Sequence, residues 1–181
     1  MNYDNQSTII NADYNSMPLD ILCDHIENTH HKYVAAKSVE IKRNIEKLIS
    51  QQPDTIETFS EVKFIFNEIV AQLSMHMMRE ELMLFPVIKK MVKTGTPVKT
   101  LFGSIRAPIE TMLNEHDSEE ERFNTIATLT HSYQSTEDSS DLHKETLAML
   151  NEFHKDLLQH IHLENDILFP KSIILEEKIN S

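Results

Sequence analysis

The chain has no tryptophan, only two glycines and only one cysteine among its 181 residues. Tight β-hairpins usually need glycine, so a sequence this poor in glycine favours long helices over sheets. The single cysteine, Cys23, excludes an internal disulfide and a cysteine-based zinc cluster, and its apolar neighbours predict a small core residue. The composition therefore predicts an all-α protein.

Basic residues are scarce as well: 17 Lys and Arg stand against 29 Asp and Glu, a net charge of −12. This balance argues against a nucleic-acid partner, which would require basic faces, and is compatible with collecting cations. No apolar run approaches the roughly 20 residues that span a bilayer, and no signal peptide is recognisable. We therefore expect a cytoplasmic protein without a membrane partner. The sequence carries no signal for its oligomeric state.

Apolar residues recur at helical spacing over four long stretches. We expect an N-terminal tail over residues 1–16 and a single bundle over residues 17–178. The expected helices cover about residues 16–50, 56–92, 104–133 and 141–177. Pro86 should kink the second, because proline removes one backbone hydrogen bond. Short connections between four long helices imply an antiparallel up-down-up-down four-helix bundle.

The pattern H-x-x-x-E-x-x-x-L-F-P occurs twice in the chain. It begins at His76 and at His160, and it places Glu80 and Glu164 four residues after these histidines. On a helix this spacing puts histidine and glutamate on one face. A single such pair is common on helix surfaces, but repetition of the whole eleven-residue pattern, with its five specified residues, favours two halves of one metal site.

One histidine on each expected helix falls at a matching height. The four are His31, His76, His116 and His160. Residues at one level of an antiparallel bundle lie symmetrically about the connecting loops, and the midpoints of consecutive pairs fall at about residues 53, 96 and 138, inside expected loops. The four imidazoles should therefore share one layer with the two glutamates.

Four imidazoles and two carboxylates favour a first-row metal pair, iron above all. Glu80 and Glu164 lie on helices that run in the same direction, so each could bridge two metals from opposite sides. We therefore expect two iron ions in an oxo- or hydroxo-bridged centre. A ferritin-like site would instead place glutamate before histidine, as Glu-x-x-His.

The other histidines fit a metal site less well. Only one of His30 and His31 should point fully inward, and His31 gives the better register. His162 should face solvent or a neighbouring helix. Four more are expected to be ordinary, partly exposed histidines: His25, His131, His143 and His154.

Three further residues bear on the expected site. Glu120, one turn beyond His116, is a candidate hydrogen-bond acceptor for the ring N–H of a ligand histidine that does not face the metal. The alternative is that Glu120 is exposed to solvent as part of the acidic run of residues 119–121. Glu27 is a candidate for an open metal position, although an exposed place on the flank of its helix is favoured. Gln52 lies about 30 Å along the helix from His31, so it should not bind metal.

Several segments together resemble the hemerythrin-like domain of the repair-of-iron-centres family over about residues 17–175. The matching segments are Leu19–Val34, His76–Glu81, Glu115–Asp117, His160–Asn165 and the two Leu-Phe-Pro triplets. The resemblance implies a cytosolic non-haem di-iron protein that restores iron–sulfur clusters after nitric oxide or peroxide damage, usually as iron donor. Damaged iron–sulfur proteins would be its clients. It also implies four terminal histidine ligands and two bridging glutamates, the same six residues as above.

The chain departs from this family in two ways. Members commonly begin with a small cysteine-bearing domain, whereas here a short tail precedes the bundle, so we expect any thiol-dependent step to need another protein. Many members also have a histidine where this chain has Gln52.

Two other functions fit the same residues. One is a hemerythrin-like protein that binds or senses oxygen or nitric oxide, and the other is a di-iron oxidoreductase acting on nitric oxide or peroxide. The resemblance favours a metal-binding repair protein over an enzyme with turnover.

Overall fold

Seven α-helices make up most of the computed structural model, which describes residues 13–181. They are α1 (Leu19–Ile26), α2 (Lys32–Gln51), α3 (Ile56–Arg79), α4 (Phe85–Thr94), α5 (Arg106–Leu129), α6 (Asp141–His162) and α7 (Phe169–Asn180). Three π-helical turns, η1 (Glu27–His31), η3 (Glu80–Leu84) and η4 (Leu163–Leu168), and one 3-10 turn, η2 (Pro53–Thr55), complete the order.

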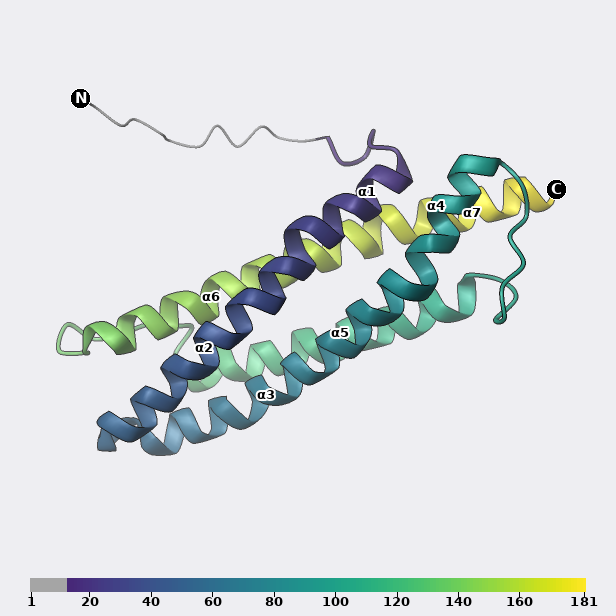
Figure 1. Cartoon of the computed structure of the whole chain (residues 1–181). Coiled ribbons are helices and arrows are strands. Elements are labelled where there is room, and N and C mark those ends of the chain that lie inside the picture. The colour runs from purple at the N-terminus through teal and green to yellow at the C-terminus, as the bar shows by residue number, and fades with distance from the viewer. Residues whose placement is uncertain (1–12) are drawn as a thin grey trace, which may run out of the picture.

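The π-helical turns join the α-helices into four long helices that run antiparallel to their neighbours (Figure 1). The first long helix is α1–η1–α2, the second α3–η3–α4, the third α5 and the fourth α6–η4–α7. No strand occurs in the described part of the chain. The predicted all-α four-helix bundle is therefore confirmed. Residues 1–12 of the expected tail lie outside the described residues.

The third long helix ends earlier than the sequence predicted, at Leu129 instead of about Tyr133. The hydroxyl of Thr130 donates to the carbonyl of Ile126 at 2.7 Å, and the next three residues have positive φ, between 49° and 62°. Tyr133 is held there by its hydroxyl, which lies 2.9 Å from Nδ1 of His154. A left-handed run of three residues cannot continue a right-handed helix, so α5 stops before it.

Pro86 and Pro170 are accommodated in the same way. Each is the second residue of an α-helix, α4 or α7, that follows a π-helical turn directly. A proline ring inside a regular α-helix collides with the carbonyl four residues earlier and removes one hydrogen bond. The wider turn before each proline changes that local bonding pattern, and the long helix continues.

Two apolar cores lie at different heights of the bundle. The first is centred on Phe66, Phe123 and Phe153, whose ring centroids are 5.4 to 6.4 Å apart. The second contains both Leu-Phe pairs of the repeated pattern, Leu84-Phe85 and Leu168-Phe169. Phe85 stacks on the ring of His31, and Phe169 stacks on that of His116. The repeated Leu-Phe pairs thus form the apolar support directly next to the histidine layer.

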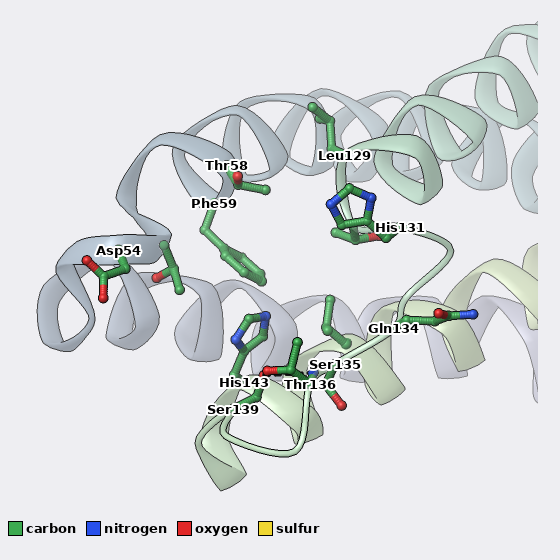
Figure 2. A pocket seen from close by; sticks show the side chains of 13 residues that line it. Asp54, Thr58, Phe59, Leu129, His131, Gln134, Ser135, Thr136, Ser139 and His143 are labelled. Carbon is green, nitrogen blue, oxygen red and sulfur yellow. Dashed lines mark hydrogen bonds between the residues drawn. The ribbon is translucent and has the colours of Figure 1, made fainter.

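A cavity of about 220 Å³ lies at the end of the bundle where α5 and α6 are connected (Figure 2). His131 and His143 line it with Phe59 and several hydroxyl side chains, whereas none of the six expected ligands does. It is therefore separate from the histidine layer. Among residues 13–181, no helix is both long and apolar enough to cross a membrane.

Candidate metal centre

The six expected ligands come together in the middle of the bundle, all nearly or fully buried. His76 and Glu80 stand one turn apart where α3 passes into η3, and His160 and Glu164 do so where α6 passes into η4. His31 is the last residue of η1, and His116 lies in the middle of α5. Three of the four long helices therefore have their π-helical turn at the cluster. Such turns frequently mark functional sites.

The cluster divides into two groups of four potential ligands. One consists of His31, Glu80, His160 and Glu164, and the other of His76, Glu80, His116 and Glu164. Within each group the ligand atoms lie within 4.8 Å of one another. Both carboxylates belong to both groups, which is the arrangement expected of bridging ligands.

Each carboxylate directs one oxygen toward each group. Oε2 of Glu80 lies 3.4 Å from Nε2 of His31, and Oε1 of Glu80 lies 3.3 Å from Nε2 of His76. Oε1 of Glu164 lies 3.0 Å from Nε2 of His160, and Oε2 of Glu164 lies 3.1 Å from Nε2 of His116. Within residues 13–181, none of these four buried oxygens has a hydrogen-bond partner. Lone pairs that converge in this way without a donor suit a cation, so the residues fit a metal pair.

The electrostatics of the cluster favour the charged form of Glu164. Burial alone would raise the pKa of Glu164, but the imidazoles of His160 and His116 hold that pKa well below its usual range. Burial would likewise lower the pKa of His76, yet the carboxylates of Glu80 and Glu164 raise it well above the usual value. An ionised carboxylate in an apolar layer is costly unless a positive charge balances it, which a bound metal would do.

Acceptors behind three of the imidazoles fix how the rings are oriented. Nδ1 of His31 lies 2.8 Å from Oε1 of Glu81, and Nδ1 of His76 lies 2.9 Å from Oε2 of Glu115. Nδ1 of His116 lies 2.7 Å from Oδ1 of Asn165. A proton on Nδ1 leaves Nε2 free to bind metal, and the acceptor makes the ring a stronger ligand.

The sequence did not predict these acceptors, although it offered a signal for them. Glu81 follows Glu80, Glu115 precedes His116, and Asn165 follows Glu164. Each acceptor is thus the chain neighbour of an expected ligand, and each serves a ligand on another helix. Polar residues directly next to an expected ligand in the sequence are therefore the candidates for such acceptors.

The prediction that Glu120 accepts from a ligand histidine is wrong. Its side chain is exposed, whereas Glu119 is 3% exposed. The buried stripe of α5 passes through Met112, His116, Glu119 and Phe123, so the inward position after His116 is the third residue and not the fourth. Burial raises the pKa of Glu119 to about 7, although Arg122, 2.7 Å away, lowers it in part.

The expectation that only one of His30 and His31 points inward is also wrong, because both are buried. They fall in the π-helical turn η1, which departs from the regular helical spacing on which the expectation rested. His30 stacks on His160, and its Nδ1 lies 2.9 Å from Oδ1 of Asp156. It belongs to neither group of potential metal ligands.

Glu27 and Gln52 lie outside both groups of potential ligands. Glu27 is half-buried and accepts a hydrogen bond from Nζ of Lys89 at 2.7 Å, so the structure gives no support to its candidacy as a ligand. Gln52 follows the last residue of α2 and donates to the hydroxyl of Ser140. Gln52 is thus at the end of the bundle, as predicted.

The remaining histidines lie outside the cluster. His162 is exposed and pairs with Asp166 at 2.6 Å, as the sequence suggested. His131 is exposed, and three others are partly buried: His25, His143 and His154.

Comparison with known proteins agrees with this geometry. A relative from Neisseria gonorrhoeae, named iron-sulfur cluster repair protein DnrN, is 30% identical over 158 residues, which is 87% of this chain and 94% of the relative. One from Haemophilus influenzae, named probable iron-sulfur cluster repair protein, is 32% identical over 92% of this chain and 70% of its own length. The iron-sulfur cluster repair protein YtfE of Pectobacterium carotovorum is 30% identical over 89% and 69%, respectively. The hemerythrin HHE cation binding domain matches residues 24–172, and the chain therefore belongs to the hemerythrin family.

Proposed function

We propose that this protein is a non-haem di-iron protein that repairs iron–sulfur clusters damaged by nitrosative or oxidative stress, acting as an iron donor. The observation that carries the proposal is the double use of Glu80 and Glu164, which gives two adjacent groups of two imidazoles and two shared carboxylates. Relatives named iron-sulfur cluster repair proteins, similar over most of this chain, support the repair role.

Each iron ion would be bound by two histidines and by both glutamates. His31 and His160 would hold one ion, His76 and His116 the other, and the two glutamates would bind both. Acceptors such as Glu81 and Glu115 favour a proton on Nδ1 of the ligand histidines, and the two apolar cores limit the access of water from either end of the bundle. When bound, the iron is available to replace the iron that a damaged iron–sulfur cluster has lost. Damaged iron–sulfur proteins are the proposed clients.

Iron transfer to a damaged client tests the proposal. The protein is loaded anaerobically with isotopically labelled ferrous iron and mixed with a purified iron–sulfur dehydratase inactivated by nitric oxide. We expect the label to enter the dehydratase cluster, and activity to return, faster than with the same concentration of free ferrous iron. Glu80→Ala should not transfer iron. The matched control, Glu120→Ala, changes an exposed glutamate and should transfer iron as the wild type does.

Three results would contradict this function. Transfer no faster than from free iron would exclude a donor role. A stable oxygenated spectrum without transfer would indicate an oxygen-binding protein. Steady consumption of nitric oxide or peroxide with a reductant, again without transfer, would indicate an oxidoreductase.

A further inference from the structure

The two halves of the cluster differ in how their imidazoles are supported. His76 and His116 both have an acceptor for Nδ1, at 2.9 and 2.7 Å. In the other half, His31 has one at 2.8 Å, but Nδ1 of His160 has no partner within residues 13–181, although the residue is fully buried. One half therefore has two supported imidazoles and the other has one.

The side chains that provide this support also differ in how firmly other residues hold them. Glu115, behind His76, is 29% exposed and is clamped by Arg79, whose Nη2 donates to both of its oxygens at 2.6 Å. Glu81, behind His31, is 43% exposed. Among residues 13–181, His31 is the one ion-pair partner of Glu81, so no basic side chain holds this carboxylate in place as Arg79 holds Glu115. The acceptor of His31 is therefore held less firmly than that of His76.

His30 lies directly beside the unsupported His160. Asp156 lies one turn before His160 on α6, and its Oδ1 accepts from Nδ1 of His30 at 2.9 Å. The ring of His30 stacks against that of His160, with centroids 5.7 Å apart and planes 11° from parallel. His30 thus pairs with one oxygen of Asp156 and covers one face of the ligand ring.

The less supported half is also the half that a surface hollow reaches. A hollow of about 350 Å³ lies between the first and second long helices, and both His31 and Glu81 line it. Ala35 and Ser74 line its opposite sides, on α2 and α3. A smaller hollow of about 140 Å³, beside Arg79 and Met112, is lined by none of the four histidines. The large hollow is therefore a route between solvent and His31.

We propose that the two metal positions are unequal, and that the one formed by His31, His160 and the shared glutamates exchanges its iron through this hollow. The position formed by His76 and His116 retains its iron. The physical basis is twofold: loss of an outer acceptor lowers metal affinity roughly 10–100-fold, and only the exchanging position has a histidine in the large hollow. This inference rests on the proposed function and identifies which of the two irons is the cargo.

Competition with a chelator tests the inequality directly. The holoprotein, loaded anaerobically with ferrous iron, is mixed with an excess of a chromogenic ferrous chelator, and iron release is followed with time. We expect one equivalent to leave at least about 10 times faster than the other. A crystal structure after the fast phase should show anomalous scattering only between His76 and His116. A single phase, or scattering that persists between His31 and His160, would overturn the proposal.

Matched substitutions separate the two positions. Glu81→Gln should accelerate only the fast phase, whereas Glu115→Gln should accelerate the slow phase until it approaches the fast one. Ala35→Trp, which narrows the hollow at a position that is not itself a ligand, should slow the fast phase and leave its amplitude at one equivalent. Equal effects of Glu81→Gln and Glu115→Gln on both phases would refute the assignment, as would an unchanged fast phase in Ala35→Trp. Helical content and unfolding midpoint, measured by circular dichroism, establish that each variant is folded.

The two proposals can fail separately. Two release phases without iron transfer to a damaged client would leave the inequality intact and refute the donor function. Iron transfer accompanied by a single release phase would support the donor function and refute the inequality of the two metal positions.

Discussion

Glu80 and Glu164 are equivalent carboxylates in two helices: each directs one oxygen toward the pair His31 and His160 and the other toward the pair His76 and His116. Both are fully buried. Each follows its histidine by four residues in the repeated pattern, and each lies in or beside a π-helical turn. The repeat thus supplies two shared ligands from two helices that run in the same direction.

Replacing a shared glutamate should therefore remove more metal than replacing a histidine. Glu80→Ala or Glu164→Ala takes a ligand from both positions, whereas His31→Ala takes one from a single position. We expect both glutamate variants to fall well below the metal content of any single histidine variant. Metal analysis of the purified proteins measures this, with Glu120→Ala as the control; full occupancy in both glutamate variants would contradict shared binding.

Replacing Gln52 should lower the stability of the fold slightly and leave the metal content unchanged. It follows the end of α2 and donates to the hydroxyl of Ser140, which also accepts from the backbone N–H of His143 at the start of α6. Gln52→Ala should lower the free energy of unfolding by at most about 1 kcal/mol, the usual net value of an exposed hydrogen bond. Metal content should equal that of the wild type, and a loss of metal would count against the assigned ligand set.

Glu119 should make the metal-free protein lose stability as the pH rises. Burial raises its pKa from 4.5 to about 7, so the folded protein keeps a proton that the unfolded chain releases. This contribution is present below about pH 4.5 and is lost as the pH rises through 7. Glu119→Gln should therefore match the wild type near pH 4.5 and be more stable at pH 8, by up to roughly 3 kcal/mol.

Urea unfolding at several pH values measures the Glu119 effect. The exposed Glu121→Gln serves as the control and should follow the wild type at every pH. A Glu119→Gln variant whose stability parallels the wild type from pH 4.5 to 8 would show that Glu119 keeps its charge in the fold.

Phe153 should be among the costliest core positions. It is fully buried, and its ring lies 5.4 Å from that of Phe66 and 5.6 Å from that of Phe123. Phe153→Ala leaves a cavity among these rings and should reduce the free energy of unfolding by about 3–5 kcal/mol. Phe64→Ala, at a position that is 63% exposed, should change it by less than about 0.5 kcal/mol. Equal losses in the two variants would contradict the placement of the core.

The sequence by itself determined the four long helices and the layer in which their histidines meet. Glycine scarcity and apolar periodicity indicated the bundle, and the repeated pattern placed His76 with Glu80 and His160 with Glu164 one turn apart. These relationships are local, because helical periodicity fixes which residues share a face. The level of His31 and His116 followed from antiparallel symmetry about the loops, which also depends only on positions along the chain.

Only the tertiary structure decided what surrounds that layer. Whether Glu119 or Glu120 faces inward depends on the rotation of α5 about its axis, which packing against its neighbours sets. His30 and His31 are both buried because a π-helical turn interrupts the regular spacing, and the acceptors Glu81, Glu115 and Asn165 each serve a histidine on another helix. Contacts between helices depend on rotation and on local changes of helical pitch, and a one-dimensional periodicity contains neither.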